Sequence, residues 1–75
     1  ILNKMEDNYE LSDRIRIGRR IENLRKQAGL SQRDLAARCG IAQSTVYRIE
    51  AGKFSPRLDL LENIANALGK IVDLV

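Results

Sequence analysis

Apolar residues recur at helical spacing in four stretches of the chain, and short polar segments that contain glycine separate these stretches. The first stretch has an apolar residue every three or four positions, at Ile17, Ile21, Leu24 and Ala28. This stripe predicts a helix over residues 13–28. Ser12 or Asp13 is placed to cap its N-terminus, and Gly29 is placed to end it.

The second and third stretches predict two short helices joined by a tight turn. Ser31 and Asp34 have the spacing of a capping box at the start of the second helix. Gly40 is expected to end that helix in the left-handed conformation, which glycine adopts without steric cost. The third helix is predicted over residues 43–51, with Gly52 closing it. The apolar positions expected to face inward are Leu35, Ala36, Cys39, Val46 and Ile49.

The fourth stretch predicts a helix over residues 58–68, whose apolar face comprises Leu58, Leu61, Ile64, Ala65 and Leu68. Residues 70–75, KIVDLV, favour a short extended segment, with a short fifth helix as the alternative. A single strand is marginal, so its expected partner is the same segment in a second chain. Residues 1–12 are interpreted as an N-terminal arm or a short extra helix. The predicted fold is therefore all-α: residues 13–75 form a compact four- to five-helix domain, with a short C-terminal strand as an option.

Residue composition argues against several classes of protein. The chain has no histidine and a single cysteine, Cys39, so an internal disulfide is impossible and a metal site would depend on carboxylates. No nucleophile–base pair or phosphate-cradling glycine loop is present, and we therefore expect neither an enzyme nor a bound metal or cofactor. No apolar run approaches the roughly 20 residues that span a bilayer. One buried-looking thiol fits a reducing compartment, so a cytoplasmic location is predicted.

The charges are segregated along the chain. Residues 14–57 hold eleven basic and three acidic side chains, a net charge of +8, whereas residues 1–13 carry −3 and residues 58–75 carry −2. A basic middle between acidic ends is typical of a surface that binds a polyanion. A membrane surface could attract the same patch, so charge alone does not choose DNA.

Residues 31–51 have the skeleton of a helix-turn-helix, two short helices joined by a turn that contains glycine. If Val46 and Ile49 face the core, helical geometry turns four neighbours outward: Gln43, Ser44, Tyr47 and Arg48. The major groove of DNA admits one helix, in which glutamine can pair with adenine and arginine with guanine. An ordinary solvated surface is the alternative interpretation of this face.

Residues 17–68 resemble the Cro/repressor-like (XRE-type) helix-turn-helix family, and the segments that carry the resemblance are LRKQAGLSQRDLA, STVYRIEAGK and LENIANALG. The resemblance implies base reading by Gln43, Ser44, Tyr47 and Arg48, and phosphate contacts by Gln32, Thr45, Lys53 and Arg57. Tyr47 is expected either to pack on a thymine methyl group or to reach a phosphate. Arg25 and Glu50 match a structural ion pair. Ala42 departs from the family, which commonly has a serine or threonine N-cap there.

The predicted function is a sequence-specific transcriptional regulator, a repressor that binds a palindromic site on double-stranded DNA as a homodimer. The alternative is the antitoxin of a toxin–antitoxin pair, which would repress its own operon and also bind a toxin protein. The small size and the strand-like tail favour that alternative. A restriction-modification controller protein is a third possibility of similar size.

Overall fold

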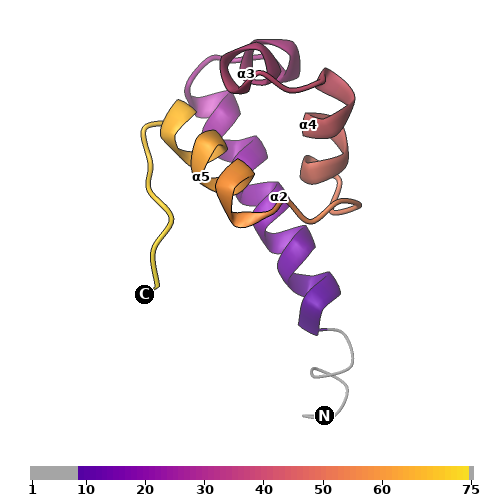
Figure 1. The fold of residues 1–75 in the computed structure, drawn as a ribbon. Coiled ribbons are helices and arrows are strands. Elements are labelled where there is room, and N and C mark those ends of the chain that lie inside the picture. Colours follow the sequence, from indigo (N-terminus) through magenta and orange to yellow (C-terminus); the bar gives the residue numbers. More distant parts are fainter. Residues whose placement is uncertain (1–8, 75) are drawn as a thin grey trace.

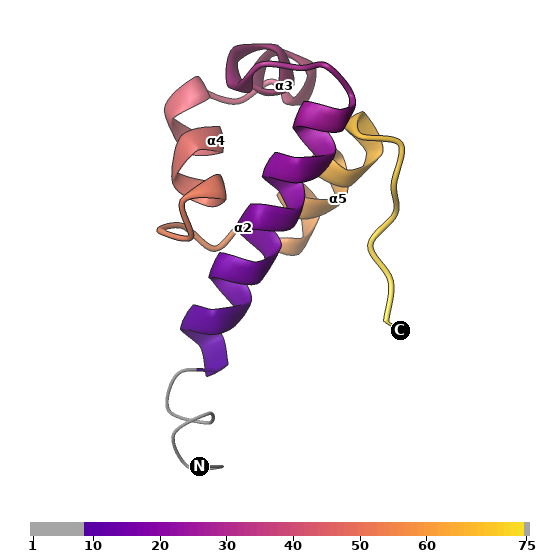
Figure 2. The same cartoon turned by 180° about the vertical axis from the view of Figure 1, so that it is seen from behind.

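The computed structural model describes residues 9–74, which form four α-helices and no strand (Figure 1). Helix α2 spans Tyr9–Gln27, α3 spans Gln32–Cys39, α4 spans Gln43–Glu50 and α5 spans Leu58–Ala67. Helix α3 lies near the C-terminal end of α2, and α4 and α5 lie on different sides of α2 (Figures 1 and 2). The predicted all-α class is confirmed. None of these four helices is both long enough and apolar enough to cross a membrane.

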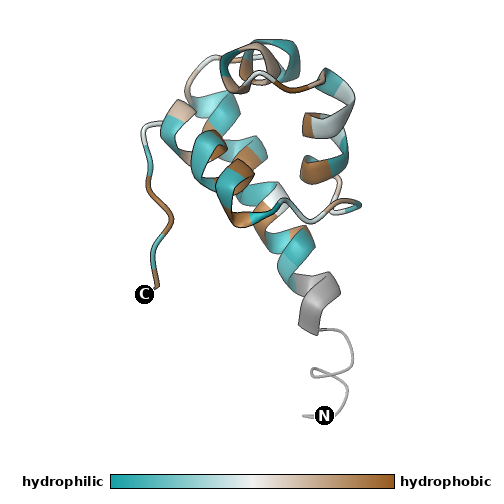
Figure 3. Cartoon of the chain, viewed as in Figure 1, coloured by the Kyte–Doolittle hydropathy of each residue, from teal (hydrophilic) through white to brown (hydrophobic). Residues whose placement is uncertain are grey.

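The core lies where the three shorter helices meet α2. Its buried members were all predicted to face inward: Ile21, Leu35, Ala36, Cys39, Val46, Ile49 and Ile64. Figure 3 places the hydrophobic part of α4 on the side that faces the other helices. Helix α4 therefore presents its polar side to solvent.

Two positions on the predicted apolar faces are exposed. Ala28 follows the last residue of α2, in a turn where Gly29 takes a φ of 73°. Leu58 is 61% exposed. The buried face of α5 is centred on Ile64, and a residue six positions earlier lies about 120° away around the helix. Leu60 packs against the core instead.

Helix α2 begins earlier than predicted. It runs without a break from Tyr9 through Asp13, so the prediction that Ser12 or Asp13 caps its N-terminus is wrong. Serine and aspartate favour caps but are tolerated inside a helix, and nothing in this stretch breaks one. Asp13 pairs with Arg16 one turn on, at 3.2 Å from Oδ1 to Nη2. Of the predicted arm, residues 1–8 lie outside the described residues.

The turn chemistry of α3 and α4 follows the prediction. Ser31 Oγ accepts from the backbone N–H of Asp34, and the Asp34 carboxylate accepts from the backbone N–H of Ser31, both at 3.0 Å. The backbone N–H of Ser31, and after it the Ser31 hydroxyl, hold the pKa of the Asp34 carboxyl below its usual value. Gly40 has φ 68° and ψ 34°, the left-handed conformation. Ala42 occupies the N-cap of α4 and makes no side-chain cap bond.

The missing cap of α4 gives a first testable expectation. The backbone of Ala42 already has the extended N-cap conformation, with φ −72° and ψ 145°, so a serine oxygen there can accept from the first turn. Ala42→Ser is expected to stabilise the fold by about 1 kcal/mol. For a domain of this size that raises the melting temperature by about 4–8 °C. The measurement is thermal unfolding followed by circular dichroism.

The control for that variant is Ala37→Ser, which makes the same chemical change at an exposed position within α3. Serine is a slightly poorer helix former than alanine, so this change is expected to lower the melting temperature by a small amount. Equal shifts in the two variants would contradict a capping effect at residue 42.

The C-terminal tail, residues 70–74, does not form the alternative short helix, and it pairs as a strand with no other part of residues 9–74. The N–H of Lys70 donates to the carbonyl of Ala65 at 2.8 Å, and the backbone beyond it is irregular. Ile71 is 79% exposed and Leu74 is 98% exposed. A strand needs a neighbouring strand for its hydrogen bonds, and residues 9–74 of this chain supply none, so pairing with the same segment of a second chain stays a prediction.

Candidate nucleic-acid interface

The turn between α3 and α4 fixes which side of α4 faces solvent. The N–H of Ile41 donates to the carbonyl of Ala36 at 3.0 Å and closes the turn. The side chain of Ala36 is small and buried. Val46 and Ile49 are each only 1% exposed and anchor α4 on the core. Four exposed side chains form the opposite face, which we call the reading face: Gln43, Ser44, Tyr47 and Arg48. These are the four predicted base-reading residues.

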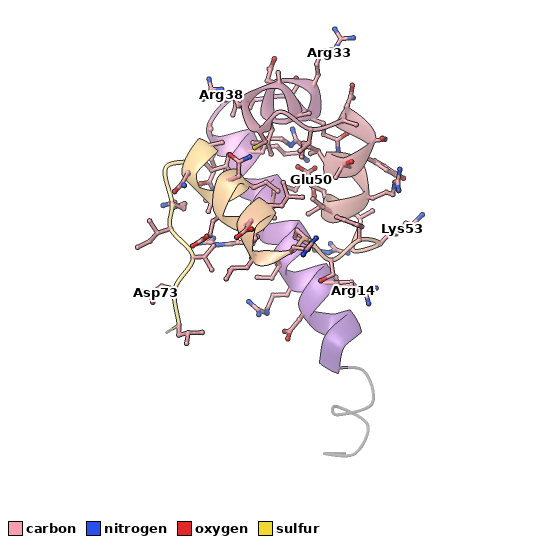
Figure 4. All side chains as sticks on the ribbon, viewed as in Figure 1. Arg14, Arg33, Arg38, Glu50, Lys53 and Asp73 are labelled. Atoms are coloured by element: carbon pink, nitrogen blue, oxygen red, sulfur yellow. The ribbon has the colours of Figure 1, made fainter. Side chains whose placement is uncertain are left out.

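A buried ion pair braces α4 against α2. Arg25 donates to both carboxylate oxygens of Glu50, through Nε at 2.6 Å and Nη2 at 2.9 Å. Both residues are only 7% exposed, and Figure 4 shows Glu50 in the interior. The bond to Glu50 raises the pKa of Arg25 above its usual value, although burial opposes the shift. Arg25 Nη1 also donates to the carbonyl of Leu30 at 2.8 Å. The pair that the resemblance implied is thus formed between these helices.

The same carboxylate holds Gln32, the first residue of α3. Gln32 Nε2 donates to Glu50 Oε1 at 3.0 Å, and the side chain is half-buried. An amide nitrogen has two protons, so this bond leaves the second one for another acceptor. Arg25, Glu50 and Gln32 therefore form one network that joins three helices beside the reading face. The family resemblance implied the ion pair but not the bond to Gln32.

The other predicted phosphate-binding residues lie in the first turn of α4, in the loop after it and at the start of α5. Thr45 is half-buried in the first turn, and its N–H donates to the carbonyl of Ala42 at 3.0 Å. Lys53 follows α4 in the loop, where its N–H donates to the carbonyl of Arg48 at 2.9 Å and its side chain points outward (Figure 4). Arg57 is exposed at the N-cap position of α5. Both cations of this set, Lys53 and Arg57, therefore lie after the C-terminal end of α4.

Two residues that position α4 and α3 were missed from the sequence. Gly18 is buried where α2 crosses the end of α4, and a Cβ there would lie 2.9 Å from the carbonyl oxygen of Glu50 and closer still to that of Ile49. A glycine in the middle of an amphipathic helix was the available signal for this close approach. Asn63 donates from Nδ2 to the carbonyl of Cys39 at 2.9 Å, which ties α5 to the end of α3. No sequence pattern marked that bond.

Cys39 itself has the environment of a core residue. Its side chain is 8% exposed, and burial raises the pKa of the thiol. A raised pKa keeps the sulfur in the unreactive thiol form. This agrees with its interpretation as part of the apolar side of α3.

Two helices locked by a left-handed glycine turn, with the polar face of the second helix exposed, define a helix-turn-helix DNA-binding domain. The chain belongs to the helix-turn-helix (HTH_3) family of transcriptional regulators, whose family model matches residues 21–74. The XRE-type resemblance is thereby confirmed.

The relatives include regulators from archaea, bacteria and a phage. An HTH-type transcriptional regulator of Methanothermobacter thermautotrophicus is 44% identical over 50 residues, which cover 67% of this chain and 72% of the relative. The immunity repressor of Bacillus phage phi105 is 38% identical over 53 residues, 71% of this chain and 37% of the repressor. The crystal structure of an HTH_3 family transcriptional regulator from Vibrio cholerae superposes with a TM-score of 0.76 at 31% identity, and covers 81% of this chain and 34% of that one.

Proposed function

We propose that this chain is a transcriptional repressor that binds a palindromic operator as a homodimer. The observation that carries the proposal is the reading face, four polar side chains held outward because Val46 and Ile49 are locked in the core. The phage relative that is named an immunity repressor supports repression rather than activation. In a repressor, occupation of the operator by the domain itself excludes other proteins, so no catalytic group is required.

Within the reading face, Gln43 and Ser44 lie in the first turn of α4 and Arg48 lies one turn further on. The N-terminal residues of a recognition helix reach base edges. Glutamine pairs bidentately with adenine, and arginine with N7 and O6 of guanine. We therefore assign base reading to these three side chains, with phosphate contacts from a second set: Gln32, Thr45, Lys53 and Arg57.

The length of α4 supports a dimer. Eight residues make a helix about 12 Å long, which spans only three or four base pairs. So short a site recurs often in any genome, and a second copy on the same DNA doubles the sequence that is read. In a two-fold dimer the two recognition helices would lie roughly 34 Å apart, one turn of DNA.

The test is selection of bound duplexes from a random DNA pool with the purified chain. The proposal expects a motif with two inverted half-sites whose centres are about 10 base pairs apart. A single asymmetric motif would contradict the dimer, and no enrichment at all would contradict sequence-specific binding.

Arg48→Ala and Lys53→Ala are expected to weaken DNA binding in different ways. Loss of a bidentate arginine–guanine contact costs about 1–3 kcal/mol at the selected site and relaxes the preference at one base pair. Loss of a phosphate contact weakens binding to all sequences and lowers the slope of log K against log salt by about 0.9. The measurement is a salt titration of each variant with the selected duplex and with a scrambled duplex. If the two variants gave the same pattern, the division between base and phosphate contacts would be wrong.

An antitoxin is the second candidate, and the exposed tail is the observation in its favour. Ile71 and Leu74 present apolar side chains that the rest of residues 9–74 leave largely uncovered, as a segment that docks on another protein would. Co-expression with the product of the adjacent gene tests this role. A stable complex that the double change Ile71→Ser and Leu74→Ser abolishes would support an antitoxin, whereas two proteins that purify separately would contradict it.

A further inference from the structure

Helix α2 lines one side of α4 with a stripe of three side chains. Ile15, Arg19 and Glu22 are spaced four and three residues apart and so share one face of α2. With Tyr47, Glu50 and Ala51 of α4 they line a hollow of about 360 Å³. Figure 2 shows the two helices side by side. Arg19 therefore lines the same hollow as Tyr47, a residue of the reading face.

The two carboxylates that line this hollow already have ion-pair or hydrogen-bond partners other than Arg19. Glu22 pairs with Lys26 at 3.3 Å, and Glu50 is held by Arg25 and Gln32. Arg19 is exposed and makes no hydrogen bond or ion pair with any other residue in the range 9–74. The Arg19 guanidinium thus lines this hollow beside α4 without an acidic partner among the described residues.

Tyr47 also lines a second hollow, which lies at the start of α3 and of α4. The other residues of that hollow are Gln32, Gln43 and Ser44. Tyr47 is therefore shared by the hollow that Arg19 lines and the hollow that Gln32 lines, and the three residues belong to three different helices. We call these three residues the α2-side edge. When a helix lies in the major groove, the base edges form the floor of the groove and the phosphates of the two strands run along its walls. Residues on the flanks of the helix therefore face phosphates.

We propose that the α2-side edge is a binding site for the DNA backbone, in which Arg19 and Tyr47 bind phosphate next to Gln32. This inference rests on the proposed entry of α4 into the major groove. Guanidinium and phenol groups are both frequent phosphate donors, and guanidinium matches a phosphate bidentately. Tyr47 thereby acts on the backbone and not on a thymine methyl group. The DNA contact surface extends beyond the helix-turn-helix to α2.

The experiment compares Arg19→Ala with Arg20→Ala in salt titrations of binding to the selected duplex and to a scrambled one. The two arginines are neighbours on α2 and both are exposed, but Arg20 lines a different hollow, between α2 and α5. Both variants lose one positive charge, and both replace an arginine of α2 with alanine, so net charge and helix propensity change by the same amount. Arg19→Ala is expected to weaken binding to both duplexes and to lower the slope of log K against log salt by about 0.9, whereas Arg20→Ala leaves the slope unchanged. Arg19→Lys keeps the charge and is expected to retain the slope.

Equal falls in slope for Arg19→Ala and Arg20→Ala would show a general charge effect and overturn the contact. An unchanged slope in Arg19→Ala would overturn it as well. Tyr47→Phe removes only the hydroxyl and is expected to weaken binding severalfold without altering the selected motif. Unchanged affinity in Tyr47→Phe, which keeps the aromatic ring, would return that residue to a contact with a thymine methyl group. If the wild-type chain bound no duplex, the proposed function would fail first, and this inference with it.

Discussion

Gly18→Ala is expected to lower the free energy of unfolding by about 2 kcal/mol, although alanine is the better helix former. A new Cβ would overlap the carbonyl oxygens of Ile49 and Glu50, and a backbone oxygen cannot rotate away as a side chain can. Overpacking of this kind costs about 3 kcal/mol, and the gain in helix propensity returns about 1 kcal/mol. Relief of the clash requires α4 to move away from α2, so the position of the reading face changes too.

The measurement for Gly18→Ala is thermal unfolding, with an expected fall in melting temperature of about 8–16 °C for a domain of this size. Asn23→Ala is the matched control, because it also introduces alanine into α2, at an exposed position. That variant is expected to melt slightly above the wild type. If Gly18→Ala had the same melting temperature as Asn23→Ala, the crossing of α2 and α4 would have room for a methyl group.

The helix-turn-helix could be predicted almost completely from the sequence because its signals are local. Leu35, Ala36, Val46 and Ile49 repeat at helical spacing on both sides of a glycine, and this pattern fixes both the core and the exposed face of α4. Each of these positions depends on neighbours within about twenty residues. The exposure of the reading face followed from the same geometry.

The features that could not be predicted depend on other parts of the molecule. Ser12 favours a cap but is also tolerated inside a helix, so the sequence did not show where α2 begins. Leu58 looked like a core residue until the position of Ile64 fixed which side of α5 is buried. The hydrogen bonds from Gln32 to Glu50 and from Asn63 to Cys39 join residues 18 and 24 positions apart. Partners at such separations are set by tertiary packing and not by a local pattern.

Glu50→Ala is expected to have the largest effect on stability of any change considered, a loss of about 3–5 kcal/mol. The variant leaves the Arg25 guanidinium buried without its partner, and it also removes the acceptor of Gln32. A domain of 75 residues has a free energy of unfolding of roughly 4–11 kcal/mol, so much of the stability disappears. Chemical denaturation monitored by circular dichroism measures the loss.

The double variant Arg25→Met with Glu50→Leu separates the burial of a lone charge from the loss of the pair itself. Replacing both partners with apolar side chains of similar size is often neutral, so the double variant is expected to be more stable than Glu50→Ala alone. If Glu50 is a scaffold residue, the double variant selects the same DNA motif as the wild type. Its affinity is still expected to fall, because Gln32 is no longer held at the start of α3. A changed DNA motif in the double variant would instead make Glu50 a base-reading residue. If the double variant were no more stable than Glu50→Ala, the ion pair itself would stabilise the contact between α2 and α4.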